Sequence, residues 1–268
     1  MNILDHIIAH KVKEVAERKQ LFPVKGLEQS TYFSLRTLLM SEAIQREDGT
    51  GIIAEFKRKS PSKGVINSTA SVEETTNGYV EAGAAVLSVL TDKDFFGGSS
   101  EDLLTARRFN TCPIIRKDFT IDEYQIVEAK SMGADAILLI AAVLTSKQLK
   151  DMTIFAHTFG LEVLLEVHDE EELKKSVDAG ANLIGVNNRN LKTFEVSTAI
   201  SKQLASLIPD SVVKVSESGL SSPDSLIELR EFGYEGFLMG ENFMKHSHPG
   251  KAAKEFMDEL RRLRSVNK

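Results

Sequence analysis

Cysteine is almost absent from this 268-residue chain, which has one, Cys112. A single cysteine excludes a disulfide framework and a metal cage built from cysteines alone, and it is typical of a reducing compartment. Long hydrophobic runs are absent too: the longest, near residues 136–143, is well under half of the roughly 20 residues that a membrane helix needs. The N-terminal segment MNILDHIIAHK has no basic stretch before its apolar residues, so we expect no signal peptide and a cytoplasmic location.

The chain has only a small excess of negative charge, with a formal net charge of -6. This balance argues against non-specific binding to nucleic acid. The histidines lack the spacing of a ligand set, so we expect no metal ion. Hydrophobic residues make up 42% of the chain, which is enough for a buried core and argues against disorder.

A short pattern recurs along the chain: a helical stretch, then a glycine, then an apolar run, as in EAGAAVLSVL and SMGADAILLI. Glycine often ends a helix because it adopts positive φ without a Cβ clash, and nearly continuous apolar runs are typical of strands buried on both faces. The glycines are Gly83, Gly133, Gly160, Gly180 and Gly233. The predicted strands begin near Ile52, Val86, Pro113, Ile137, Val163, Leu183, Val212 and Phe237.

Alternating strands and helices predict an α/β protein with a parallel sheet, and eight such strands in a chain of this length predict a closed (β/α)8 TIM barrel. Helices are expected over 122–132, 146–159, 169–179 and 223–232, with N-caps at Ser146, Asp169 and Ser222 and with Pro223 at a first helical position. An open doubly wound sheet is the alternative. It would need a G-x-G-x-x-G turn after the first strand, and EFKRKSPSKG has none.

The residues before the first strand have a helical pattern of their own. Residues 33–40 suggest a short helix, and an apolar face precedes it. That face comprises Ile3, Leu4, Ile7, Ile8, Val12 and Val15. So short a segment would have little core by itself. We therefore predict a single domain over 1–268, in which a helical N-terminal extension (1–48) covers one end of the barrel (49–268).

The predicted strands end in polar residues, and the carboxyl ends of the strands carry the active site in this fold. These ends contain Glu55 and Lys57, Lys117 and Asp118, Glu166, Asn187 to Arg189, Glu217 to Gly219, and Gly240 to Asn242. Residues two apart on a strand, such as Glu55 and Lys57, point to the same side. Neighbouring charges and partial burial move pKa values toward neutrality, so Lys57, Lys117 and Glu166 are the candidate acids and bases.

The loop after the first strand, FKRKSPSKG, is basic and contains no acid. Its cations are Lys57, Arg58, Lys59 and Lys63, and we expect the loop to be a mobile lid that binds an anion. The last two strands end in SESG and MGEN, and glycine-rich ends there often bind phosphate through backbone N–H groups. We predict a phosphorylated, multiply anionic substrate. Phe95, Phe96 and Phe119 flank strand ends and are candidates to sandwich an aromatic ring.

Seven segments at these strand ends carry a resemblance to a known family: IIAEFKRKSPSKG, SVLTDKDFFGGS, IIRKDF, LLEVHDEEEL, IGVNNRNL, VSESGL and FLMGENFM. In this order, over about residues 52–244, they resemble indole-3-glycerol phosphate synthase, the tryptophan-pathway barrel enzyme. The resemblance implies a lyase that closes the ring of 1-(o-carboxyphenylamino)-1-deoxyribulose 5-phosphate and releases carbon dioxide and water. It implies no cofactor, because the substrate ring itself delocalises the electrons.

The resemblance also implies roles for individual residues. Lys117 matches the general acid of ring closure, and Glu166 matches a glutamate of the dehydration stage. Lys57 matches the lysine that contacts the substrate carboxylate, and Glu55 matches its carboxylate partner. The catalytic set is completed by Asn187, Arg189, Glu217 and Ser218.

The binding contacts follow from the same resemblance. The phosphate contacts are Ser60, Gly219, Gly240 and Glu241, mostly through backbone N–H groups, and the ring is walled by Phe96, Phe119 and Leu191. The Glu241 carboxylate is expected to point away from the phosphate, since like charges repel. The implied partners are the small anionic phosphorylated substrate and other tryptophan-pathway enzymes, without nucleic acid or membrane.

Two alternatives stay open at this point. Another phosphate-binding barrel, such as phosphoribosylanthranilate isomerase, uses a cysteine and an aspartate, whereas Cys112 begins a predicted strand instead of ending one. A non-catalytic barrel that senses a phosphorylated ligand would not need the charged set at the strand ends.

Overall fold

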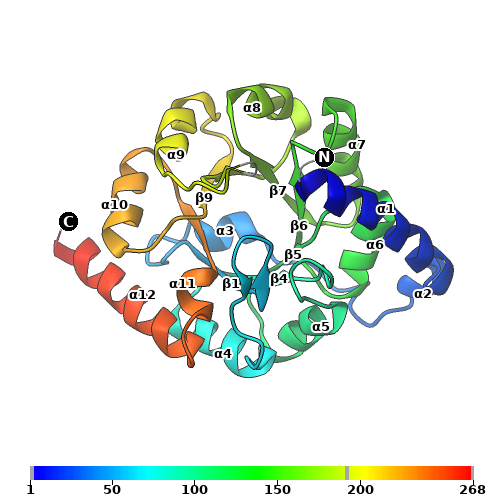
Figure 1. The fold of residues 1–268 in the computed structure, drawn as a ribbon, viewed down its shortest axis with the longest axis horizontal. Helices are drawn as coiled ribbons and strands as arrows, with labels where there is room; N and C mark the ends of the chain where they lie inside the picture. Colours follow the sequence, from blue (N-terminus) through cyan, green and yellow to red (C-terminus); the bar gives the residue numbers. More distant parts are fainter. Residues whose placement is uncertain (1–2, 191–192, 267–268) are drawn as a thin grey trace.

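The computed structural model describes residues 3–190 and 193–266. Eight parallel strands form a closed barrel in the order β1-β10-β9-β8-β7-β6-β5-β4, ringed by helices (Figure 1). They are β1 (Ile52–Phe56), β4 (Val86–Leu90), β5 (Ile114–Lys117), β6 (Ala136–Ile140), β7 (Glu162–Val167), β8 (Leu183–Asn187), β9 (Val213–Glu217) and β10 (Gly236–Met239). The predicted (β/α)8 barrel is confirmed, and each strand begins within one residue of its predicted start.

Helices cover the outside of the barrel. They are α4 (Val72–Ala82), α5 (Ser100–Phe109), α6 (Glu123–Ser131), α7 (Ser146–Thr158), α8 (Glu170–Ser176), α9 (Ala199–Leu204), α10 (Pro223–Glu231), α11 (Glu241–Met244) and α12 (Pro249–Val266). Asp169 and Ser222 are N-caps, as predicted. The prediction for Ser146 is wrong, because Thr145 caps α7. Its side chain accepts the N–H of Gln148, whose side chain accepts the N–H of Thr145, so the two form a capping box.

Two apolar layers hold the barrel together. Ile52 and Ala54 of β1 face the helices in the larger layer, and Ile53 between them faces the barrel interior. This is the two-residue period of a strand. At the next inward position, the apolar core of β1 gives way to Glu55, which is 3% exposed. The strands thus carry apolar side chains along the barrel and polar ones at its carboxyl end.

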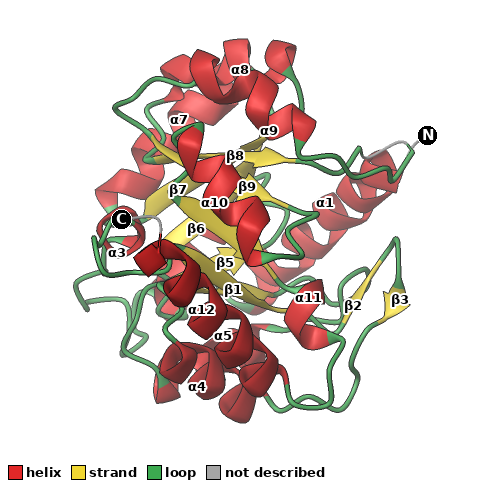
Figure 2. Cartoon of the chain, turned by 90° about the vertical axis from the view of Figure 1, so that its left-hand side faces the viewer, coloured by secondary structure: helices red, strands yellow, loops and turns green. Residues whose placement is uncertain are grey.

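The N-terminal extension contains α1 (Ile3–Leu21), α2 (Val24–Leu27) and α3 (Met40–Ile44). The predicted helix over 33–40 is wrong, since α3 begins only at Met40. Figure 2 shows α3 at the opposite end of the barrel from the hairpin β2 (Lys59–Ser60) and β3 (Gly64–Val65), which follows β1. Helix α3 packs into the inner apolar layer, whereas α1 reaches the hairpin end. The extension therefore contacts both ends of the barrel instead of one.

The apolar face predicted for α1 is only partly buried. Ile7 and Val15 are buried, but Val12 is 55% exposed and Lys11 is buried in its place. The reason is what α1 covers: two aspartates at the ends of β4 and β5, which an ammonium group can satisfy and a methyl group cannot.

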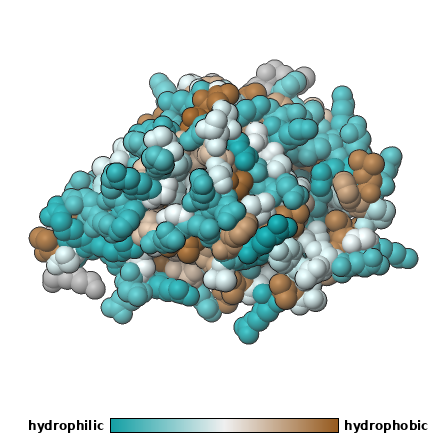
Figure 3. Space-filling view, turned by 90° about the horizontal axis from the view of Figure 1, so that it is seen from below, coloured by the Kyte–Doolittle hydropathy of each residue, from teal (hydrophilic) through white to brown (hydrophobic). Residues whose placement is uncertain are grey.

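The outer surface of the helices is polar. The face of the molecule shown in Figure 3 is mainly hydrophilic, with apolar residues in small scattered groups. Helix α12 carries exposed ion pairs such as Lys254 with Asp258, 2.7 Å apart. In the described ranges 3–190 and 193–266, we find no helix with the length and apolar character of a bilayer span.

Candidate active site

A cavity of about 210 Å³ opens at the carboxyl ends of the barrel strands. The predicted site residues that line it are Glu55, Lys57, Ser60, Phe96, Lys117, Phe119, Glu166, Asn187, Arg189, Glu217, Ser218, Gly219, Gly240 and Glu241. Leu191, the remaining predicted contact, lies outside the described residues. Helix α1 adds an apolar wall that the sequence reasoning missed: Ile3, Leu4 and Ile7. Residues from every barrel strand or its following loop thus meet in one place.

Lys117 lies at the floor of this cavity, at the end of β5. Its Nζ lies 2.6 Å from Glu217 Oε2 and 3.5 Å from Glu166 Oε2. Burial alone lowers the pKa of this lysine, but Glu217, Glu166 and Glu55 outweigh burial and raise it. Lys117 is therefore a charged ammonium group that contacts the carboxylates of Glu217 and Glu166.

The two carboxylates around Lys117 differ in their surroundings. Burial would raise the pKa of Glu166, but Lys117, His168 and Asn187 stabilise the charge and hold the pKa below its usual range. Burial, together with the nearby charge of Glu166, raises the pKa of Glu217 to about 7 although Lys117 lies closer to Glu217. Since both carboxylates share one lysine, they titrate as a unit, and the pair retains a proton to a higher pH than an isolated carboxylate.

A second ion pair, Lys57 with Glu55, lies at the end of β1. Lys57 Nζ donates to Glu55 Oε1 over 2.5 Å, and Ser88 Oγ donates to Glu55 Oε2 over 3.4 Å. Burial raises the pKa of Glu55, but Lys57 and Lys117 lower it further, so the net pKa is lowered. Both lysines of the site therefore contact a carboxylate: Lys57 contacts Glu55, and Lys117 contacts Glu217.

Glycines leave room for these carboxylates. A Cβ on Gly185 of β8 would lie 2.2 Å from Glu217 Oε1, and a Cβ on Gly240 would lie 2.8 Å from Glu55 Oε1. Neither glycine has a positive φ, so the constraint is steric. Gly185 is a site residue that the sequence reasoning missed, because only the packing of neighbouring strands reveals its role.

The ends of β9 and β10 form a polar rim. Ser218 has a φ of 68°, which is rare for a residue with a side chain, and Gly219 follows with a φ of 74°. The Glu241 carboxylate lies 3.4 Å from Lys63 Nζ and 3.7 Å from an Arg189 nitrogen. Its negative charge is therefore balanced by two cations at this rim.

The two comparisons that use the sequence agree on one family. The family model for indole-3-glycerol phosphate synthase matches residues 4–256. The chain belongs to the indole-3-glycerol phosphate synthase family. It is 47% identical to the indole-3-glycerol phosphate synthase of Bacteroides thetaiotaomicron, with 97% of this chain and 99% of that protein covered. It is 40% identical to the one from Campylobacter curvus, with 96% and 99% covered.

Solved structures with similar folds are more distant in sequence. A mandelate oxidase mutant superimposes with a TM-score of 0.62 at 14% identity, covering 81% of this chain and 74% of that chain. A chain of the tryptophan synthase a2b2 complex from Pyrococcus furiosus gives 0.58 at 16% identity, covering 78% and 96%. These likenesses show the barrel fold, and the indole-3-glycerol phosphate synthase family rests on the sequence matches.

Membership in the indole-3-glycerol phosphate synthase family excludes the isomerase alternative. The position of Cys112 also argues against an isomerase that uses a cysteine. Cys112 precedes β5, at the amino end of the barrel, far from the strand ends that carry the site. Burial raises the pKa of its thiol to about 11, so the thiol stays protonated at neutral pH. In the described part of the chain, no group of three or more His, Cys, Asp or Glu side chains could hold a metal ion. The absence of a metal stays a prediction.

The basic loop after β1 differs from the prediction for it. Arg58 points away from the cavity, since its guanidinium binds Asp102 over 2.6 Å and stacks on Phe56. Lys59 Nζ donates to the carbonyl of Asp94. Two of the four cations of the predicted anion-binding loop are therefore paired within the protein, Arg58 with a carboxylate of α5 and Lys59 with a carbonyl of the loop after β4.

Aromatic and histidine side chains complete the surroundings of the site. The rings of Phe96 and Phe119 line the cavity with centroids 5.8 Å apart, whereas Phe95 packs against α1.

His168 contacts two glutamates, with Nε2 3.3 Å from Glu166 Oε1 and Nδ1 3.0 Å from Glu172 Oε2. Burial lowers the pKa of His168, but the neighbouring carboxylates of Glu166 and Glu172 raise it to about 10. His168 is therefore a cation in direct contact with Glu166.

Proposed function

We propose that this chain converts 1-(o-carboxyphenylamino)-1-deoxyribulose 5-phosphate into indole-3-glycerol phosphate, carbon dioxide and water. The observation that carries the proposal is the placement of Lys117, a buried ammonium group 2.6 Å from Glu217 and 3.5 Å from Glu166 at the floor of the cavity. Ring closure requires an acid at a carbonyl oxygen, and dehydration requires an acid and a base. Membership in the indole-3-glycerol phosphate synthase family supports the same reaction.

In the ring-closure step, the ring carbon that bears the carboxylate attacks the ketone carbon. Lys117 donates a proton to the ketone oxygen, which becomes a hydroxyl group. Carbon dioxide then leaves, and the electrons of its bond restore the aromatic ring. The shared proton of the Glu166–Glu217 pair can recharge Lys117, because the raised pKa of Glu217, about 7, keeps that proton available near neutrality.

In the dehydration step, the hydroxyl group leaves as water after taking a proton from Lys117. A base must remove a proton from the carbon next to the nitrogen, and we assign this to Glu166. Its lowered pKa keeps it ionised, and the Asn187 side chain, which donates to Glu166 Oε1 over 3.2 Å, fixes its orientation. A carboxylate held in one orientation meets the geometric demand of proton abstraction.

The anionic and aromatic parts of the substrate need separate contacts. We assign the substrate carboxylate to Lys57, which Glu55 orients, and the polar chain to Asn187 and Arg189. Phe96 and Phe119 would wall the ring, since both line the cavity and lie next to each other. The ion pair with the buried Glu55 carboxylate fixes the position of the Lys57 ammonium group, as carboxylate binding requires.

The phosphate is assigned to the rim formed by the loops after β1, β9 and β10. The contacts would be Ser60, Gly219, Gly240 and Glu241, mostly through backbone N–H groups. A carboxylate beside a phosphate would be repulsive by itself. The pairing of Glu241 with Lys63 and Arg189 offsets that charge, so its side chain can remain at the rim.

The remaining proposals concern the whole chain. No cofactor is needed, because the substrate ring delocalises the electrons. We propose one domain over 1–268, since α1 and α3 pack against opposite ends of the barrel. The small anionic phosphorylated substrate is the partner that the cations of the cavity suit, and other tryptophan-pathway enzymes and a cytoplasmic location stay predictions.

The test is direct because the chain contains no tryptophan. Indole fluorescence from the product therefore rises against a low protein background. The purified chain is mixed with the substrate, and indole fluorescence and carbon dioxide are measured together. Equal amounts of both are expected, and a folded protein that binds inorganic phosphate but releases neither would refute the proposed reaction.

A further inference from the structure

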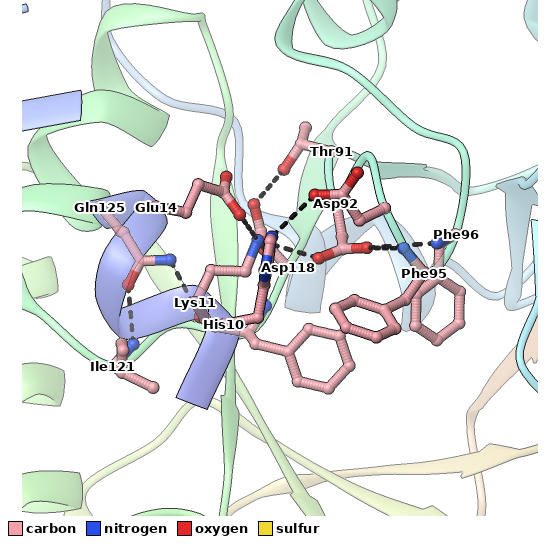
Figure 4. A network of polar contacts seen from close by, with 12 residues as sticks. His10, Lys11, Glu14, Thr91, Asp92, Phe95, Phe96, Asp118, Ile121 and Gln125 are labelled. Atoms are coloured by element: carbon pink, nitrogen blue, oxygen red, sulfur yellow. Dashed lines mark hydrogen bonds and ion pairs between the residues drawn. The ribbon is translucent and has the colours of Figure 1, made fainter. Parts of the chain in front are cut away.

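Lys11 of α1 lies outside the cavity and contacts the two loops that carry its aromatic wall. The Lys11 side chain is 1% exposed, and its Nζ lies 2.9 Å from Asp92 Oδ2 and 3.0 Å from Asp118 Oδ1 (Figure 4). Glu14, one turn further along α1, is a third partner at 2.7 Å. Burial lowers the pKa of Lys11, but Asp118 and Asp92 raise it further, so the ammonium stays charged. A fully buried lysine is rare unless its charge is paired in this way.

Each of the two aspartates holds the backbone of an aromatic residue. Asp92 follows β4, and its Oδ1 accepts the N–H groups of Phe95, over 2.8 Å, and Phe96, over 3.2 Å (Figure 4). Asp118 follows β5, and its Oδ1 accepts the N–H of Phe119 over 2.8 Å. A single aspartate therefore connects the ammonium of Lys11 to the backbone N–H of each cavity aromatic.

The two aspartates depend on Lys11 to different degrees. Asp118 has a second cation, because an Arg116 nitrogen lies 3.0 Å from Asp118 Oδ2. Within residues 3–190 and 193–266, the ion pair of Asp92 is the one with Lys11. Without the ammonium, Asp92 would be a nearly fully buried carboxylate close to the carboxylate of Asp118. It would have to take up a proton or turn toward water, and either change weakens its hold on Phe96.

The rest of α1 points to the same role. Ile3, Leu4 and Ile7 of this helix line the cavity themselves, so its position sets one wall directly. Lys11 fastens the helix to the loop ends that form the neighbouring wall. The Phe96 carbonyl is held from the other side, by the N–H of Lys59.

We propose that Lys11 is a positioning residue that sets the spacing of Phe96 and Phe119 and thereby the affinity of the cavity for the aromatic half of its ligand. The inference rests on the proposed function, because it assigns the aryl group to these rings. The proposal predicts that the binding of the aryl group depends on Lys11. The binding of the phosphate group, at the ends of β9 and β10, does not depend on it.

The test uses Lys11→Met in the full chain. Three constants are measured: KM for the substrate, and the inhibition constants of indole-3-glycerol phosphate and of inorganic phosphate. We expect the first two to rise at least tenfold and the phosphate constant to change less than twofold. The matched control is Lys19→Met, which removes an exposed pair of the same helix with Asp122, 2.6 Å apart, and should leave all three unchanged.

The outcomes separate this inference from the proposed function. A wild-type chain without turnover refutes the function, whereas an active wild type with unchanged constants in Lys11→Met refutes the role of Lys11. Equal losses of phosphate and indole-product affinity also refute it, because they indicate a general structural role. If Lys11→Met does not fold, Asp92→Asn is measured in the same way. It should weaken the indole-product constant at least threefold with phosphate unchanged, and any other result overturns the proposal.

Discussion

The replacement Gly185→Ala tests whether the position of Glu217 matters for catalysis. Gly185 lies on β8, beside β9, and its backbone is one that alanine can adopt, since its φ is not positive. The added methyl group would lie 2.2 Å from Glu217 Oε1, where ordinary contact begins at 3.4 Å. The carboxylate must therefore move by about 1 Å, away from the position in which it accepts from Lys117 over 2.6 Å.

A displacement of this size has a large kinetic effect. Misplacing a reacting group by about 1 Å can reduce a rate by roughly 10²-fold. We expect kcat to fall about 100-fold while KM stays within about threefold, because the predicted phosphate and ring contacts lie elsewhere. Overpacking should cost about 1–3 kcal/mol of unfolding free energy, which a barrel of this size can tolerate.

The assay follows indole fluorescence under steady-state conditions, with thermal unfolding as a check on the fold. Gly26→Ala is the matched control, because a Cβ on Gly26 of α2 would meet nothing within 4 Å. It should change neither kcat nor KM. A folded Gly185→Ala variant with kcat within threefold of wild type would show that the position of Glu217 is not required.

Three further predictions follow from the same contacts. Lys117→Ala should lower kcat by about 10²–10⁴-fold with the fold intact, and a loss under tenfold would contradict its role as general acid. Lys57→Ala should raise KM as well as lower kcat, so an unchanged KM would count against its contact with the substrate carboxylate. His168→Gln should reduce the unfolding free energy by roughly 2 kcal/mol below pH 6.5, because the charged bonds to Glu166 and Glu172 are lost. Since the folded pKa of His168 is raised to about 10, this difference should shrink as pH rises from 6.5 to 10, and a difference independent of pH would refute the charge assignment.

The strands and the members of the candidate site could be predicted from the sequence because their signals are local. Gly83 and Gly133 end helices with a φ of 101° and 82°, and apolar runs follow both. Once the barrel is predicted, the polar residues that end each run must meet at one end, since all its strands are parallel. This is why Lys117, Glu166 and Glu217 could be grouped although they are far apart in the chain.

The errors in the extension arise where a helix meets a polar surface. Helical periodicity predicts which residues share a face, but not what that face covers. Val12 was placed in the core for its apolar character, and Lys11 occupies the buried position because α1 lies over Asp92 and Asp118. The segment before Met40 is not helical, and side chains of the barrel bond its backbone: Lys130 donates to the carbonyl of Leu35, and Asp135 accepts the N–H of Leu38.

The sequence by itself determined the order of the elements, the barrel and the set of charged groups at its carboxyl end, because helix stops, apolar runs and strand ends are properties of neighbouring residues. The tertiary structure decided which charges face the cavity and which are paired elsewhere. Arg58 turns to Asp102, His168 stands behind Glu166, and Gly185 makes room for Glu217. These outcomes depend on distances between side chains from different strands, and burial amplifies electrostatic differences that no local pattern contains.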